Sequence, residues 1–129
     1  MTKIIWLDLK LILAVHDMQL AEHGGISGLR EEELLKSALE KPKFLLHYQP
    51  DVDIASLAAS YAFAISSSHT FFDGNKRVSA VAMMIFLKLN GFSITASQEE
   101  KYIIFMQLAA SELSEAELAI WTRKNLMEL

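Results

Sequence analysis

The chain has 129 residues, 52% of them hydrophobic and 22% charged, with a formal net charge of −4 and no cysteine. This composition excludes general disorder, disulfide bonds, thiol catalysis and cysteine-ligated zinc, and it disfavours direct binding to nucleic acid. The longest apolar run, eight residues from Ala80 to Leu87, is too short to cross a bilayer, and no signal-peptide pattern opens the chain, so we expect one cytoplasmic domain over residues 1–129 without membrane contact.

Capping residues and helix breakers define three predicted helices in the first half of the chain. These helices run from Leu9 to Glu22, from about Leu29 to Glu40 and from about Asp53 to Ser67. Asp8 is a suitable N-cap for the first helix, Gly24-Gly25 suits its end, and Pro42 is expected to stop the second helix. Residues 43–50 lack a helical period and are expected to be extended or a loop. The third helix is apolar almost all round, which is typical of a buried helix.

The second half of the chain predicts three more helices and a short strand. The helices run from Asn75 or Lys76 to Asn90-Gly91, from Gln98 to Ala110 and from Glu115 to Met127, and the strand covers Phe92 to Thr95. Ser97 with Glu100, and Ser114 with Glu117, have the spacing of capping boxes. The predicted fold is therefore all-α, with about six helices around a central buried helix.

A dense polar cluster, His69 to Arg77, separates two apolar helices of this predicted core. Unpaired polar groups cost free energy when they are buried, so a cluster at this position is expected to have a function or internal partners. Lys76 and Arg77 would lie in the first turn of a helix, where each cation opposes the helix dipole at a cost of about 0.3–1 kcal/mol. A bound anion would remove this conflict, and Gly74 would let a phosphate approach the backbone closely. The cluster therefore predicts a phosphate site.

The cluster, His69-Thr-Phe-Phe-Asp73-Gly-Asn75-Lys76-Arg77, resembles the signature of the Fic/Doc family, and its eighth residue, lysine, resembles the death-on-curing (Doc) toxin branch. Further segments are similar to Doc-type chains in order and spacing. They include Val15-His16-Asp17, Leu34-Leu35-Lys-Ser37-Ala38 and Phe86-Leu-Lys-Leu-Asn90-Gly91. The resemblance implies a Fic/Doc-like helical bundle that transfers part of a nucleotide to a protein hydroxyl.

Each residue type in the cluster suits one part of such a transfer. His69 is the candidate catalytic base, because its ordinary pKa lies near operating pH. Asp73 is the second catalytic candidate and an oxygen ligand for Mg²⁺, which usually binds through carboxylates and phosphates. The candidate residues for binding the phosphates of ATP are Gly74, Asn75, Lys76 and Arg77.

Two departures from the wider Fic pattern favour the Doc branch. Adenylyl-transferring members usually have glycine where Lys76 stands and arginine where Ala80 stands. The resemblance to Doc implies a type II toxin that transfers the γ-phosphate of ATP to a Ser/Thr hydroxyl of elongation factor Tu and arrests translation. Ser111 and Glu115 have the spacing of the family's autoinhibitory motif, but Ala116 follows, which favours external control by a Phd-like antitoxin.

Two other functions stay open at this point. The first is a Fic-type adenylyltransferase that uses the same site, and the second is a non-enzymatic binding module. The intact set of His69, Asp73, Asn75 and Arg77 argues against the binding module. Two histidines outside the cluster have simpler interpretations: we expect His16 to be a hydrogen-bonded core residue and His47 to lie in a polar loop, and a metal site on His16 and His23 lacks a third ligand.

Overall fold

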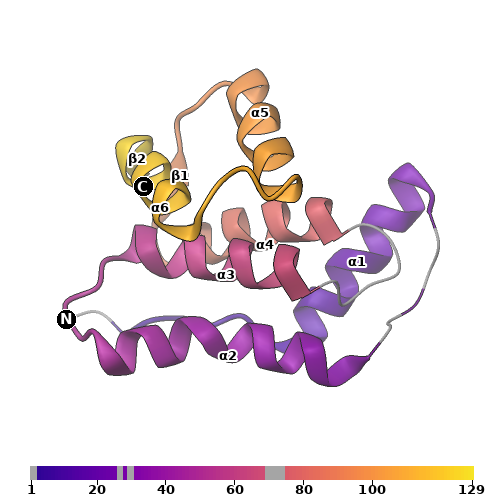
Figure 1. Ribbon diagram of the computed structural model, residues 1–129, viewed down its shortest axis with the longest axis horizontal. Coiled ribbons are helices and arrows are strands. Elements are labelled where there is room, and N and C mark those ends of the chain that lie inside the picture. Colours follow the sequence, from indigo (N-terminus) through magenta and orange to yellow (C-terminus); the bar gives the residue numbers. More distant parts are fainter. Residues whose placement is uncertain (1–2, 26–27, 29–30, 69–74) are drawn as a thin grey trace.

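The computed structural model describes residues 3–25, 28, 31–68 and 75–129. This part of the chain contains six helices and two short strands (Figure 1). In order they are α1 (Leu9–His23), α2 (Glu32–Tyr48), α3 (Ile54–Ser68), α4 (Asn75–Leu89), β1 (Phe92–Ile94), α5 (Gln98–Ala109), α6 (Glu115–Lys124) and β2 (Leu126–Glu128). The predicted all-α bundle is confirmed, with a small sheet in addition. None of the described helices is both long and apolar enough to cross a bilayer.

The central helix is α3, ten of whose 15 residues are buried. Helix α2 packs on one side of it, α6 packs on another, and α4 runs alongside (Figure 1). Most buried positions of α3 carry alanine or serine, whose small side chains let the neighbouring helices approach closely. The ring of Tyr61 on α3 packs against Phe86 on α4, with centroids 4.9 Å apart. This packing fixes α4, and with it the residues at its first turn.

Helix α2 differs from the prediction at both Pro42 and the segment that follows. Pro42 is buried inside the helix, which continues to Tyr48, so His47 lies on a helix and not in a polar loop. A proline inside a helix costs about 3 kcal/mol or more. Leu45 and Leu46 extend the apolar face beyond the proline and pack against the core. The burial of this face outweighs the local cost, which is why the helix does not stop.

The end of the chain also differs from the prediction. Helix α6 stops at Lys124, whereas we expected it to reach Met127. Residues 126–128 form β2, which pairs antiparallel with β1 so that Ile94 lies opposite Leu126. Thr95 donates both its backbone N–H and its hydroxyl to the carbonyl of Asn125, at 2.8 and 2.9 Å. Strand pairing depends on a partner distant in the sequence, so no local pattern announces it.

Most of the other helix ends follow the predicted caps. The Asp8 side chain accepts from the amide of Leu11 at 2.8 Å, and Ser114 forms a complete capping box with Glu117. Gly24 follows α1 with φ +73°, a conformation that favours glycine. His16 is 3% exposed and lies in the core, as predicted.

Candidate functional site

The predicted cations occupy the first turn of α4. This helix begins at Asn75, which is half-buried, and Lys76 and Arg77 follow it. The turn contains no acidic residue, so both cations face the positive end of the helix dipole without a compensating charge on their own helix. Three predicted site residues lie outside the described residues: His69, Asp73 and Gly74. The roles of these three stay predictions.

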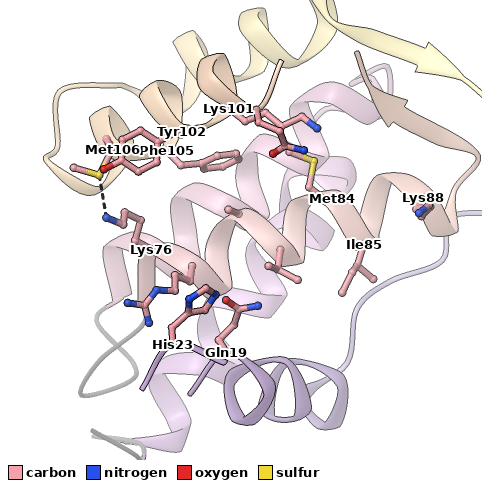
Figure 2. Close-up of a pocket in the computed structure, with 14 residues that line it drawn as sticks. Gln19, His23, Lys76, Met84, Ile85, Lys88, Lys101, Tyr102, Phe105 and Met106 are labelled. Atoms are coloured by element: carbon pink, nitrogen blue, oxygen red, sulfur yellow. Dashed lines mark hydrogen bonds between the residues drawn. The ribbon is translucent and has the colours of Figure 1, made fainter. Parts of the chain in front are cut away.

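The two cations lie at one end of a groove of about 900 Å³ between the end of α1, α4 and α5 (Figure 2). Its polar lining residues are Gln19, His23, Lys76, Arg77, Lys88, Gln98 and Lys101. Its apolar lining residues are Ala80, Val81, Met84, Ile85, Tyr102, Phe105 and Met106. The groove therefore joins the predicted phosphate site to an apolar surface.

Two stripes of α4 form the floor of the groove, because residues four apart lie on one face of a helix. One stripe contains Lys76, Ala80, Met84 and Lys88, and the other contains Arg77, Val81 and Ile85. Lys76 and Lys88 are about 18 Å apart along the helix axis, at a rise of 1.5 Å per residue. The floor thus has a cation at each end and apolar side chains between them.

The charge of the groove is opposite to that of the whole chain. The described lining residues include four lysine or arginine side chains and neither aspartate nor glutamate, although the chain has a net charge of −4. None of these four forms an ion pair with a carboxylate of the described residues. Lys36, Lys43 and Arg123, which lie outside the groove, do form such pairs. The groove consequently favours an anionic ligand.

Both cations of the first turn have hydrogen-bonding capacity to spare. The Lys76 ammonium donates to the Sδ atom of Met106 on α5 at 2.9 Å (Figure 2), and a thioether is a weak acceptor. Arg77 Nη1 is a buried nitrogen with no hydrogen-bond partner among the described residues. An unsatisfied buried donor costs about 1–3 kcal/mol, more when it is charged. The oxygen atoms of a phosphate would satisfy both groups, so the described residues fit this ligand.

Metal binding has no such support in the described part of the chain. No group of three or more His, Asp or Glu side chains there could hold a metal ion. The proposed magnesium ligand, Asp73, lies outside that part of the chain.

The sequence patterns did not predict the residues that form the two walls of the groove. Met106, Tyr102 and Lys101 on α5 face α4 from one side, and His23 lies on α1 at the other (Figure 2). Only the floor carries a local signal, since Lys76 and Lys88 have the spacing of one helical face. The walls depend on how α1 and α5 pack against α4, which periodicity does not specify.

Comparison with known proteins identifies the sequence class. The profile of the family described as the Fic/DOC family matches residues 6–87. Among curated proteins, the chain is similar to the protein kinase Doc of Escherichia phage P1. The two are 26% identical over 88 residues, which cover 68% of this chain and 70% of the phage protein. The family match includes the polar cluster and most of α4 but ends before α5.

Proposed function

The chain belongs to the Fic/DOC family, on the Doc branch, and we propose that it is a Doc-type toxin with protein kinase activity. In this proposal the γ-phosphate of ATP moves to a Ser/Thr hydroxyl of a translation factor, elongation factor Tu, and translation stops. The similarity to a phage protein kinase supports the reaction class. The target comes from the resemblance of the polar cluster to the Doc branch.

One observation carries the proposal: Lys76 and the incompletely bonded Arg77 stand together at the first turn of α4. Transfer of a phosphoryl group depends mainly on positioning and on stabilising negative charge. Two cations, the positive end of a helix dipole and the backbone N–H groups of a helix N-terminus supply both functions for a phosphate chain. Among the described residues no carboxylate pairs with either cation, which leaves their charge available to an anionic ligand.

The remaining roles fall on the segment that precedes α4 and on Asn75, the first residue of that helix. His69 would accept the proton of the target hydroxyl, which requires it to be neutral near pH 7. Gly74 and Asn75 would bring backbone and amide N–H groups to the phosphates. Mg²⁺ held by Asp73 and the phosphates of ATP would neutralise charge on the transferred group.

The floor of the groove favours phosphoryl over adenylyl transfer. Ala80 and Met84 follow Lys76 on the same stripe of α4, so no cation stands at the position where adenylyl-transferring members carry arginine. An ATP molecule whose last phosphate lies at Lys76 and Arg77 therefore has its cationic partners, whereas a triphosphate pushed further along the groove meets apolar side chains. The first orientation presents the γ-phosphorus to the hydroxyl.

The rest of the groove suits the antitoxin that this class of toxin requires. A Phd-like antitoxin segment with apolar side chains and acidic residues near both ends would match the apolar floor and the cations Lys76 and Lys88, about 18 Å apart. Such a segment would fold on binding and would cover the phosphate site. It would control the enzyme by exclusion.

Labelled ATP tests the proposed reaction directly. The protein is incubated with elongation factor Tu and ATP that carries the label at either the α- or the γ-phosphate. We expect label on the target from the γ position alone, and none with the His69→Ala variant. His47→Ala is the matched control, because His47 is an exposed histidine on α2 outside the groove. Label from the α position would indicate adenylylation, and the absence of any transfer would favour a binding module.

A further inference from the structure

The contact between Lys76 and Met106 joins the floor of the groove to one of its walls. The ammonium lies 2.9 Å from the sulfur, and no other residue of the described chain is recorded as its acceptor. We propose that Met106 is a positioning residue, which orders the Lys76 side chain toward α5 and keeps its charge available to an anion. The proposal rests on the proposed function only for the identity of that anion.

The chemistry of the thioether suits this role. A free lysine side chain samples many rotamers, and ordering it for a ligand has an entropic cost. A carboxylate would order the ammonium but would also neutralise it and compete with the incoming phosphate. An aliphatic side chain would do neither. A thioether accepts weakly and carries no charge, so it can hold the ammonium and then yield it to a phosphate oxygen.

The helix that carries Met106 is anchored to the core. Phe105, the preceding residue, is buried and anchors α5 to the core, as does Leu108. Ser97 caps the start of α5 by accepting from the amide of Glu100 at 3.1 Å. Met106 therefore projects from a fixed helix, and it is 39% exposed at the edge of the groove. Because the family match ends at residue 87, this positioning group lies outside the matched region.

Two substitutions separate a positioning role from simple packing. Met106→Leu keeps the volume and removes the acceptor, and Met106→Gln restores an acceptor through its amide oxygen. The readout is the rate at which limiting N-hydroxysuccinimide acetate acylates Lys76, followed by peptide mass spectrometry. Lys88 and Lys101 line the same groove and serve as internal standards. Thermal melting of each variant verifies that it is folded.

We expect Met106→Leu to raise the acylation rate of Lys76 by about threefold relative to Lys88, the factor that corresponds to a weak hydrogen bond. Met106→Gln should return that rate to the wild-type value or below it, because an amide oxygen is a stronger acceptor than a thioether. An unchanged rate in the leucine variant, or an equal rise in both variants, would overturn the proposal. The assay uses neither ATP nor a target protein. A failure of the kinase assignment would therefore leave its result unaffected, and the reverse also holds.

Discussion

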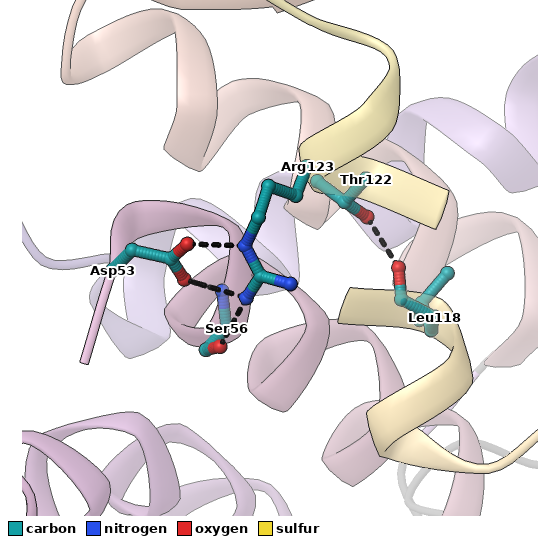
Figure 3. A network of polar contacts seen from close by, with 5 residues as sticks. All are labelled: Asp53, Ser56, Leu118, Thr122 and Arg123. Atoms are coloured by element: carbon teal, nitrogen blue, oxygen red, sulfur yellow. Dashed lines mark hydrogen bonds and ion pairs between the residues drawn. The ribbon is translucent and has the colours of Figure 1, made fainter. Parts of the chain in front are cut away.

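Arg123 on α6 donates hydrogen bonds from two guanidinium nitrogens to the carboxylate of Asp53, the residue that precedes α3 (Figure 3). Nη2 donates to Oδ1 of Asp53 at 3.0 Å and also to the hydroxyl of Ser56 at 3.1 Å. The same carboxylate accepts from the amide of Ser56 at 3.0 Å and so caps α3. One side chain therefore both starts the central helix and ties the last helix to it.

This ion pair predicts a specific pH dependence of stability. The hydrogen bond from Arg123 lowers the pKa of Asp53 from 3.8 to about 2. A carboxylate with a lowered pKa stabilises the folded state above its unfolded pKa, and this contribution is lost as the pH falls from about 4 through 2. Because the Asp53 side chain is 44% exposed, solvent screening limits the contribution to about 1 kcal/mol.

The measurement is the free energy of unfolding in urea at pH 7 and near pH 2 for the wild type and Asp53→Asn. Asparagine can still cap α3, so the variant isolates the charge. We expect a deficit of about 1 kcal/mol at pH 7 that vanishes near pH 2, in line with the value of an exposed but bidentate pair. A deficit of the same size at both pH values would show that the ion pair is not its source.

Tyr61 fixes the N-terminal segment to the central helix. Its buried hydroxyl accepts from the amide of Leu7 at 3.1 Å, and burial raises the pKa of the phenol to about 12. Tyr61→Phe leaves that amide unsatisfied, which should lower the free energy of unfolding by about 1–2 kcal/mol. Tyr48→Phe on the exposed face of α2 should have no measurable effect. Faster hydrogen exchange at the Leu7 amide in the Tyr61 variant alone would verify the mechanism.

Where local chemistry decides an element, the sequence predicts it well. Asp8 and Ser114 predict the starts of α1 and α6, because a side-chain oxygen at the N-cap satisfies an otherwise free N–H group. Ser97 does the same for α5. The first turn of α4, with Lys76 and Arg77, also follows from a local signal. The fold class and the location of the predicted cations therefore need no tertiary information.

The failures all involve partners that are distant in the sequence. Pro42 stays in a helix because Leu45 and Leu46, which follow it, pack against the core. Leu126 lies in β2 and not in the predicted extension of α6, because its backbone pairs with that of β1. Met106 lies 30 residues from Lys76, so no local pattern assigns it to the site. Periodicity reports which face is apolar but not what will cover it.

Arg77 should matter more for ligand binding than for stability. Its buried Nη1 has no partner among the described residues, so Arg77→Gln should cost the ligand-free protein little. The same variant should bind ATP about tenfold more weakly, since a hydrogen bond to a charged group is worth about 1.5–3 kcal/mol. Isothermal titration with ATP measures the affinity and calorimetric melting measures the stability.

Arg123→Gln is the matched control for that experiment, because it removes the same functional group from a residue that does not line the groove. It should lower the melting temperature through the loss of the Asp53 pair and leave ATP affinity unchanged. If Arg77→Gln instead destabilised the protein and retained its affinity for ATP, the guanidinium would be structural.

The far end of the groove should contribute to antitoxin binding. Lys88→Glu and Lys101→Glu reverse the charge at that end, and each should weaken the complex with an acidic antitoxin segment, by about 1 kcal/mol or more if the pair is partly buried. The weakening should shrink as salt increases. Lys124→Glu, on the exposed end of α6, controls for net charge. Equal effects of all three substitutions on the dissociation constant would indicate long-range attraction and not a contact in the groove.

Oxidation of Met106 should tighten its contact with Lys76. A hydroperoxide transfers one oxygen atom to the thioether sulfur and leaves as water or an alcohol, and the product is a sulfoxide. A sulfoxide oxygen is a polar acceptor, stronger than the thioether it replaces, so it should hold the ammonium more firmly and release it less readily to a phosphate. We therefore expect hydrogen peroxide to slow acylation of Lys76 and to weaken ATP binding.

Met127 provides the internal control for this prediction, because it is 46% exposed, on β2, and should oxidise under the same conditions. The Met106→Leu variant should lose the response of Lys76 to peroxide while Met127 still becomes oxidised. Mass spectrometry of the two methionine peptides reports the extent of each reaction. If Lys76 acylated faster after complete oxidation of Met106, the sulfoxide would have displaced the ammonium, and the thioether contact would depend on shape and not on its acceptor. A slower rate that appears only when Met106 is present would instead identify the sulfur as the group that sets the position of the charge.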